Sequence, residues 1–423
     1  MKILLKGCRL ADSSQKDILV DNGLIAGIAP DIRIADDGQT RVVNANGFLA
    51  TEALADVHVH FREPGRPDKE TIRTGSLAAA RGGYTAVCTM PNLNPAPDTV
   101  EHIAVEQEII GRDAVIDVFP YASITLGRAG KQVVDMEALK GRCIAFSDDG
   151  SGVQDPAVME EAMRRAASLD CIIAAHCEDN TLLHAGYIHD GEYCRTHGHK
   201  GICSESEWGQ IARDVLLAEK TGCRYHVCHI STKESVDIIR KAKARGVKVT
   251  CETAPHYLML CDRDLQEDGR FKMNPPLRSD QDRLALLAGI LDGTIDMIAT
   301  DHAPHTAEEK SRGLKGSAMG IVGLETAFPV LYTNLVRTGL ITLEKLVDLM
   351  SAAPRRIFGI GGSLAPGQKA DIALFNTELN YTIDPSAFAS MGHATPFDGW
   401  TVTGRPVMTI HNGNIVYDFY SHK

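Results

Sequence analysis

Eight short runs of apolar and β-branched residues divide the middle of the chain, and longer amphipathic stretches lie between most of them. The runs are ALADVHVHF, YTAVCTMPN, VIDVFPYAS, CIAFSDDG, CIIAAHCED, RYHVCHIS, VKVTCETAPH and IDMIATDHAPH. The stretches include DKETIRTGSLAAARGG and PAVMEEAMRRAASLD, which have a helical pattern. Eight strand–helix units predict a (β/α)8 barrel. A doubly wound open sheet is the alternative, but no Gly-x-Gly-x-x-Gly motif follows the first run.

Residues 1–50 and 359–423 have a different pattern. They contain short segments in which apolar and polar residues alternate, and Asn-Gly pairs at 22–23 and 412–413 are typical of tight turns between strands. Neither end can bury a core alone. We therefore expect both ends to form one small β-sandwich beside a barrel that spans residues 51–358.

Composition limits the classes of partner. The 423 residues, 44% of them hydrophobic, suffice for a large core. The net charge of -11 and the absence of Lys and Arg runs argue against nucleic acid or an anionic membrane surface as a partner, while a basic pocket for a small anion stays possible.

The 11 cysteines form no C-x-x-C pair, and the N-terminal residues MKILLKGCRL do not resemble a signal peptide. No apolar run reaches the ~18 residues of a membrane span. We expect a cytoplasmic protein with free thiols.

Reactive residue types collect at the carboxyl ends of the eight runs. They are His58, His60, Asn92, Asp149, His176, His229, His256 and Asp301. Barrel enzymes build their sites at this face, where the loops after the strands converge. Residues with purely structural roles would be scattered along the strands instead.

Four histidines and at least two aspartates in this set form a candidate metal site. His58 and His60 point to the same face of their strand, because side chains alternate. Such a pair alone is more often polar surface, but burying this many ionisable groups is costly without a cation. Imidazole and carboxylate ligands favour zinc, with manganese and cobalt as alternatives. Six ligands exceed the four of one tetrahedral zinc, so two ions sharing a bridge are expected.

Several motifs together resemble the dihydroorotases of the amidohydrolase superfamily. They are DVHVHFREPG, GGYTAVCTMPNLNP, FSDDG, KMNPPLR and ATDHAPH, and GSLAPGQKADIALFN resembles the return of that family to its β-sandwich. The likeness runs in order over nearly the whole chain. It implies reversible hydrolysis of the cyclic amide of (S)-dihydroorotate to N-carbamoyl-L-aspartate, whose reverse closes the ring in pyrimidine synthesis.

The resemblance also implies a ligand set. His58, His60 and Asp301 would hold one metal, and His176 and His229 the second. Many members of the superfamily bridge the two ions with a carboxylated lysine, but FSDDG has none, which matches the branch with an aspartate bridge. Asp149 fits that position better than Asp148. A hydroxide that bridges the metals would attack the ring carbonyl, with Asp301 as general base and then general acid.

The implied substrate carries a carboxylate, and Arg62 offers it a forked cation. The alternative for Arg62 is a surface salt bridge, for example with Glu63. The resemblance implies the following substrate-binding set: His60, Arg62, Asn92, Asn274, His305, and the backbone of Met319 and Gly320. His256 matches no ligand of the family and is expected to support the structure.

Two polar segments allow more than one interpretation. CRTHGHKGIC places Cys194, His197, His199 and Cys203 close together, but their spacing matches no usual zinc pattern, so a solvated loop is favoured. TAEEKSRGLKGSA, residues 306–318, has the composition of a mobile loop. It fits a lid over the site and a disordered surface loop equally well.

Two other functions stay open. A hydantoinase or allantoinase opens other cyclic amides with similar chemistry, but the Asn of MPNLNP resembles dihydroorotases and Arg62 favours an anionic substrate. A dihydroorotase-like scaffold of aspartate transcarbamoylase would be expected to lose metal ligands, and this chain keeps all six candidates. The resemblance leaves open a homodimer and an association with aspartate transcarbamoylase.

Overall fold

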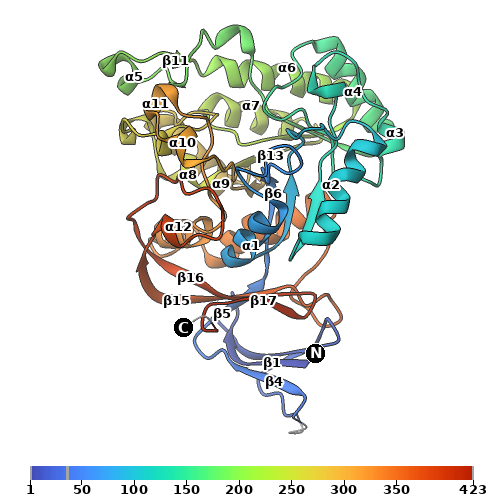
Figure 1. Cartoon of the computed structure of the whole chain (residues 1–423), viewed down its shortest axis with the longest axis vertical. Coiled ribbons are helices and arrows are strands. Elements are labelled where there is room, and N and C mark those ends of the chain that lie inside the picture. Colours follow the sequence, from blue (N-terminus) through green and yellow to red (C-terminus); the bar gives the residue numbers. More distant parts are fainter. Residues whose placement is uncertain (1, 35–37, 422–423) are drawn as a thin grey trace.

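The computed structural model describes residues 2–34 and 38–421, which form a barrel above a sheet built from both ends of the chain (Figure 1). The sheet has eight strands in the order β17-β16-β15-β5-β1-β2-β3, with β4 paired to β1. Their bounds are Lys2–Arg9 (β1), Gln15–Asp21 (β2), Leu24–Ala29 (β3), Thr40–Asn44 (β4), Leu49–Glu52 (β5), Ile372–Thr382 (β15), Thr401–His411 (β16) and Asn414–Asp418 (β17). The antiparallel pairing of β15 with β5 joins the two ends.

The sheet folds over a core of its own, as expected of a small sandwich. Ile3, Ile18, Ile372 and Ile410, from both halves of the sheet, belong to one buried cluster. The two Asn-Gly turns meet, since a Cβ on Gly413 would lie 2.6 Å from the Cα of Gly23. Only glycine fits there, because Gly413 also has a positive φ of 73°.

All eight predicted runs contribute to the barrel. Seven form strands, with bounds Leu54–Val59 (β6), Tyr84–Thr89 (β7), Asp117–Pro120 (β8), Ile172–Ala175 (β9), Arg224–Val227 (β12), Val249–Thr253 (β13) and Met297–Ile298 (β14). The fourth run contributes Phe146, which makes parallel bridges to Ala122 and Ile173. A parallel bridge between Val59 and His302 closes the barrel. The predicted fold class is therefore confirmed.

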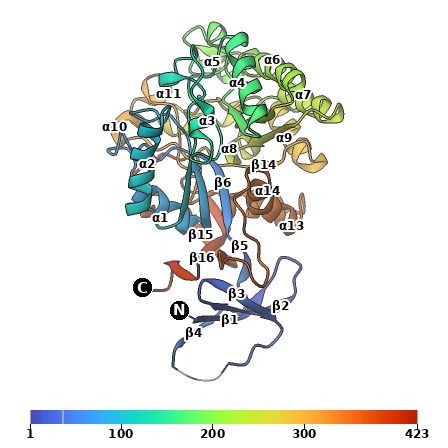
Figure 2. The same ribbon diagram turned by 90° about the vertical axis from the view of Figure 1, so that its right-hand side faces the viewer.

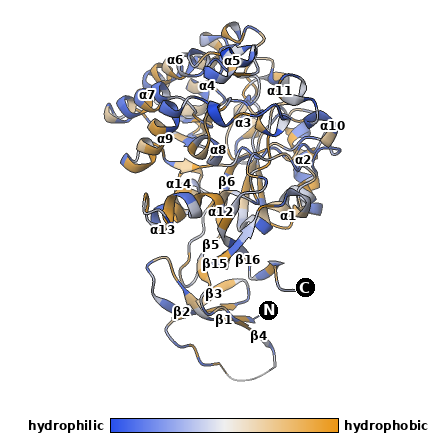
Figure 3. Ribbon diagram, turned by 90° about the vertical axis from the view of Figure 1, so that its left-hand side faces the viewer, coloured by the Kyte–Doolittle hydropathy of each residue, from blue (hydrophilic) through white to orange (hydrophobic). Residues whose placement is uncertain are grey.

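Helices surround this barrel (Figure 2). Their bounds are Ile72–Gly82 (α1), Val100–Asp113 (α2), Met136–Leu139 (α3), Pro156–Ser168 (α4), Glu192–His197 (α5), Glu205–Thr221 (α6), Lys233–Ala244 (α7), Pro255–Met259 (α8), Asp280–Asp292 (α9), Ala307–Lys310 (α10), Gly313–Gly316 (α11), Ala327–Leu331 (α12), Leu343–Val347 (α13) and Ala353–Phe358 (α14). The short strands Ile188–His189 (β10) and Gly201–Ile202 (β11) pair with each other. The helices carry both hydrophilic and hydrophobic residues, as expected of elements with one face on a core (Figure 3). In the described part of the chain, no helix is long and apolar enough to cross a membrane.

The fold places the site on the side of the barrel away from the sheet. β6 starts at Leu54, directly after β5 ends at Glu52, so the amino ends of the barrel strands face the sheet. The carboxyl end of β6 is fixed by α1, because a Cβ on Gly75 would lie 2.4 Å from the ring of Phe61. This close packing of helix on strand positions the residues that follow β6.

Candidate active site

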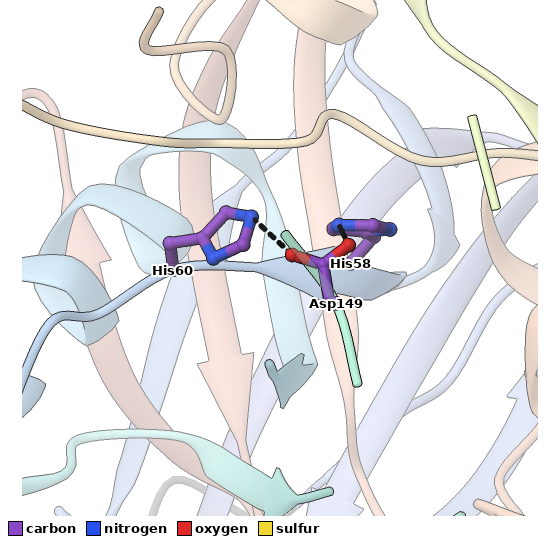
Figure 4. A group of neighbouring side chains, drawn as sticks. All are labelled: His58, His60 and Asp149. Atoms are coloured by element: carbon purple, nitrogen blue, oxygen red, sulfur yellow. Dashed lines mark ion pairs between the residues drawn. The ribbon is translucent and has the colours of Figure 1, made fainter. Parts of the chain in front are cut away.

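Asp149 lies at the centre of the predicted metal ligands. His58 and His60, at the end of β6, both point toward its carboxylate (Figure 4), with Nε2 of His58 3.5 Å from Oδ1 and Nε2 of His60 3.6 Å from Oδ2. Nδ1 of His176, after β9, and Nε2 of His229, after β12, each lie 3.7 Å from Oδ1. Asp149 thus belongs to two groups of three candidate ligands whose ligand atoms lie within 4.8 Å of one another. It is the residue that both groups share.

Asp301, after β14, completes the first group. Its Oδ1 lies 3.1 Å from Nε2 of His60 and 3.5 Å from Nε2 of His58. Asp301 and His229 have positive φ angles of 50° and 33°, which non-glycine residues rarely adopt. Such backbone conformations cluster at functional sites, where the surrounding structure enforces them.

The unsatisfied polar atoms of this cluster fit a bound cation. Nε2 of His58 and Oδ1 of Asp149 are buried and have no hydrogen-bond partner among the described residues. Unpaired polar atoms are costly in a protein interior. Nitrogen and oxygen donors in this mixture suit a borderline divalent metal, so the residues present fit the metal that the sequence predicts.

The charges of the cluster also fit a bound cation. Burial alone would lower the pKa of His58, but Asp149 and Glu252 outweigh it and raise this pKa well above its usual range. Burial would raise the pKa of Asp149, yet His58 and His229 hold it well below the ordinary value. These groups therefore compensate one another's charge in a buried site. A divalent cation on the same atoms would replace the protons that stabilise the carboxylates.

Two residues that the sequence analysis missed, Glu252 and His226, and the predicted Asn92 orient the two histidines of the first group. Nδ1 of His58 donates to Oε1 of Glu252 at 2.7 Å, and Nδ1 of His60 donates to Oδ1 of Asn92 at 2.8 Å. His226 donates from Nε2 to Oε2 of Glu252 at 3.1 Å. Such bonds fix the ring orientation of metal-binding histidines. A glutamate and a histidine inside apolar strand runs were the sequence signal that could have identified Glu252 and His226.

The predicted substrate-binding residues line one cavity of about 230 Å³ beside the metal cluster. The lining contains His60, Arg62, Asn92, Asn274, His305, Met319 and Gly320, together with Asp149, His176, His229 and Asp301. His58 lies behind this surface and is fully buried. The structure brings the predicted set together, and the role of each residue toward a substrate stays a prediction.

Arg62 is a cation without an anionic partner. Its Nε donates to the carbonyl of Pro304 at 3.2 Å, and it makes no ion pair with any carboxylate in the described ranges. The alternative pairing with Glu63 is not found, because Glu63 accepts a hydrogen bond from the backbone of Ile72. Burial lowers the pKa of Arg62 to about 10, so the guanidinium stays charged near neutral pH. A half-buried guanidinium at the cavity wall is suited to bind a carboxylate.

His305 is held as a neutral imidazole. Burial, Arg62 and Lys69 lower its pKa to about 3. Lys69 donates to Nδ1 at 3.1 Å, and Nε2 donates to the carbonyl of Met319 at 2.7 Å. His305 thus fixes the backbone that faces the cavity.

Asn274 is oriented by another residue that the sequence analysis missed. Its Nδ2 donates to Oε1 of Glu178 at 3.0 Å. The other oxygen of Glu178 lies 3.6 Å from Nε2 of His176. Oδ1 of Asn274 is buried without a partner among the described residues. This carbonyl oxygen is available to a substrate N–H.

The structure distinguishes the two neighbouring aspartates. Asp148 accepts hydrogen bonds from the backbone of Ile124 at 2.8 Å and of Thr125 at 3.1 Å, and from the Thr125 hydroxyl. The Asp148 carboxylate is therefore occupied by hydrogen bonds to Ile124 and Thr125, whereas the Asp149 carboxylate faces the histidines.

His256, in α8, is buried, and burial lowers its pKa to about 4.

The two polar segments are more ordered than their composition indicates. In the Cys/His segment, His199 binds Oε1 of Glu267 at 2.7 Å and Cys194 is buried, and these four residues form no metal group in the part of the chain that the structure describes. Residues 306–318 contain α10 and α11 instead of a loop without secondary structure. A capping box between Thr306 and Glu309 starts α10, and Lys310 and Leu314 are buried.

Comparisons with known proteins agree with this geometry. A family model described as Dihydro-orotase-like matches residues 47–235. A dihydroorotase of Geobacillus kaustophilus is 52% identical over 404 residues, 95% of this chain and 94% of that protein. A dihydroorotase of Bacillus cereus is 51% identical over 424 residues, 99% of this chain and 98% of that protein.

Solved structures share the fold. An L-hydantoinase (dihydropyrimidinase) from Arthrobacter aurescens superposes with a TM-score of 0.86 at 27% identity, covering 98% of this chain and 96% of that one. A dihydropyrimidinase from Brevibacillus agri gives a TM-score of 0.86 at 23% identity, covering 99% and 95%. The second likeness is evidence for the fold alone.

Proposed function

The chain belongs to the dihydroorotase family, and on that premise we propose that its barrel site hydrolyses the cyclic amide of (S)-dihydroorotate to N-carbamoyl-L-aspartate and catalyses the reverse ring closure. The resemblance that the motifs indicated is thereby confirmed, and the chain is a cyclic amidohydrolase. The observation that best supports the anionic substrate is Arg62, a half-buried cation beside the candidate metal ligands that forms no ion pair with a carboxylate of the described residues.

The metal assignment is part of this proposal. His58, His60 and Asp301 would hold one zinc ion, His176 and His229 the second, and Asp149 would contact both. The two groups of ligand atoms that share Asp149 support this assignment. When bound, such a pair supplies an activated water and polarises the carbonyl under attack.

The protein's own groups have separate tasks. The guanidinium of Arg62 binds the substrate carboxylate, while Asn274 and the backbone of Met319 and Gly320 hold the ring. Burial would raise the pKa of Asp301, but His60 and His58 lower it, so this carboxylate is ionised and can accept a proton. Asp301 takes the proton of the attacking water and delivers it to the ring nitrogen that leaves.

The test combines two measurements on one preparation: metal content per chain, and the loss of dihydroorotate absorbance on hydrolysis. Two zinc ions with turnover support the proposal. Full metal content without turnover of dihydroorotate, but with turnover of hydantoin or allantoin, would contradict the substrate. Neither metal nor turnover would indicate an inactive scaffold.

Three features of the wider setting stay predictions from the sequence. They are a cytoplasmic location, a homodimer and an association with aspartate transcarbamoylase. None of them enters the assignment of the site.

A further inference from the structure

The ammonium group of Lys310 lies in a cage of backbone carbonyls. Lys310 ends α10 and is 7% exposed. Its Nζ donates to the carbonyl oxygens of Lys272 at 3.0 Å, Ala318 at 2.8 Å and Gly320 at 2.6 Å. These three bonds use all the hydrogens that a lysine ammonium can donate.

Lys272 makes the reverse connection. Its Nζ donates to the carbonyl of Lys315 at 3.0 Å and lies 5.2 Å from the ring centroid of Tyr187. The backbone N–H of Gly320 also donates to the carbonyl of Lys272 at 3.1 Å. Each lysine therefore binds the backbone of the segment that carries the other.

The two connected segments form one wall of the substrate cavity. Asn274 follows Lys272 by two residues, and Met319 and Gly320 follow α11, and all three line the cavity. The fit is tight, because a Cβ on Gly320 would lie 2.7 Å from the carbonyl oxygen of Ala303. A shift of residues 318–320 would therefore change the surface that faces the substrate.

Packing alone does not explain a lysine at this position. Burial and the neighbouring Lys272 lower the pKa of Lys310 to about 7, and Lys310 forms no ion pair with a carboxylate among residues 2–34 and 38–421. A methionine would fill similar space without the cost of burying a charge, but it would leave the carbonyl groups of Ala318 and Gly320 without the donor that Lys310 supplies and would remove one of the two donors to Lys272.

We propose that Lys310 and Lys272 are positioning residues. Their hydrogen bonds to backbone carbonyls, together called the clip, hold residues 306–318 against residues 269–274 and so fix the backbone of Met319 and Gly320 for substrate binding. This role rests on the proposed function, because it concerns the same cavity. It treats residues 306–318 as a wall held in place by two lysines, rather than as a free loop.

The test uses Lys310→Met and Lys272→Met, with Lys315→Met as the matched control. The Lys315 side chain is exposed and only its carbonyl takes part in the clip.

Hydrogen exchange is measured on a peptide covering residues 306–320 in the protein without substrate. Both clip variants should exchange faster there by about tenfold or more, since bonds to a charged donor are lost. KM for dihydroorotate should rise about tenfold with kcat within about threefold, because ground-state binding is lost and the chemistry is untouched.

Unchanged exchange in correctly folded Lys310→Met, or an equal effect in Lys315→Met, would overturn the clip. Faster exchange with an unchanged KM would overturn the positioning role. If circular dichroism shows that Lys310→Met does not fold, the same measurements on Lys272→Met test the clip, because this variant removes one hydrogen bond and the contact with the ring of Tyr187. Failure of the unmodified protein to turn over dihydroorotate would contradict the proposed function, and the exchange measurement would still decide whether the clip exists.

Discussion

Oε1 of Glu252 lies 2.7 Å from Nδ1 of His58, and Nε2 of the same ring faces Asp149 at 3.5 Å. The second oxygen of Glu252 contacts His226, whose Nδ1 lies 2.8 Å from the hydroxyl of Thr250. This buried chain holds the imidazole at one nitrogen and leaves the other for a metal. Glu252 also accepts a hydrogen bond from the backbone of His229 at 3.3 Å, so it contacts a residue of each metal group.

Replacing Glu252 with glutamine should weaken metal binding. The amide keeps the shape but removes the charge that favours the N–H on Nδ1 of His58, so we expect an affinity about tenfold to a hundredfold lower. Metal retained against increasing chelator concentration measures this effect. Glu137→Gln, at an exposed position, is the control. Equal retention in the two variants would show that Glu252 does not support the metal site.

The neighbouring aspartates should respond differently to the same change. Asp149→Asn should lose at least one metal ion and all turnover while the fold persists, because an amide offers one oxygen where the carboxylate offers two. Asp148→Asn should keep its metal but lower the free energy of unfolding by about 1–3 kcal/mol, because a buried hydrogen-bond network is disturbed. Metal analysis and denaturant unfolding of both variants check this. The reverse pattern would assign the bridge to Asp148.

Arg62 should determine the preference for an anionic substrate. Arg62→Met should raise KM for dihydroorotate about a hundredfold, because a charge-assisted pair with the carboxylate is lost. Arg62→Lys should recover only part of this, since an ammonium cannot form the forked pair. Turnover of a neutral hydantoin, if present, should not fall in either variant. An equal loss for both substrates would place Arg62 outside carboxylate recognition.

Glu106 should make stability depend on pH. It is buried in α2, its Oε1 accepts a hydrogen bond from the hydroxyl of Thr89 at 2.7 Å, and burial raises its pKa from 4.5 to about 8. Between these values the folded protein holds a proton that the unfolded chain releases, so stability falls as pH rises. The loss should be about 3–4 kcal/mol between about pH 5 and pH 8.

Glu106→Gln cannot ionise and should flatten this slope relative to the unmodified protein. Urea unfolding at several pH values measures the difference. Glu108→Gln, exposed on the same helix, should keep the original slope. A parallel slope in Glu106→Gln would show that Glu106 is ionised in the folded protein.

The sequence by itself determined the barrel and most of the candidate site. Strand runs have a local signature, and parallel strands in a barrel bring their carboxyl ends to one face, so His58, His176, His229 and Asp301 could be grouped without coordinates. The two-residue spacing of His58 and His60 likewise determines that they share a face. These features depend on chain geometry within one unit and on the repetition of that unit.

Only the tertiary structure decided which buried polar atoms pair with one another. His58 and Glu252 are 194 residues apart. Asp148 and Asp149 are adjacent, yet one binds backbone and the other faces four histidines. In the same way, the composition of residues 306–318 resembles that of a mobile loop, but Lys310 binds carbonyls as far away as Lys272. A polar side chain acquires its role from the partner that satisfies it when water is excluded, and distant segments supply that partner only when the chain is folded.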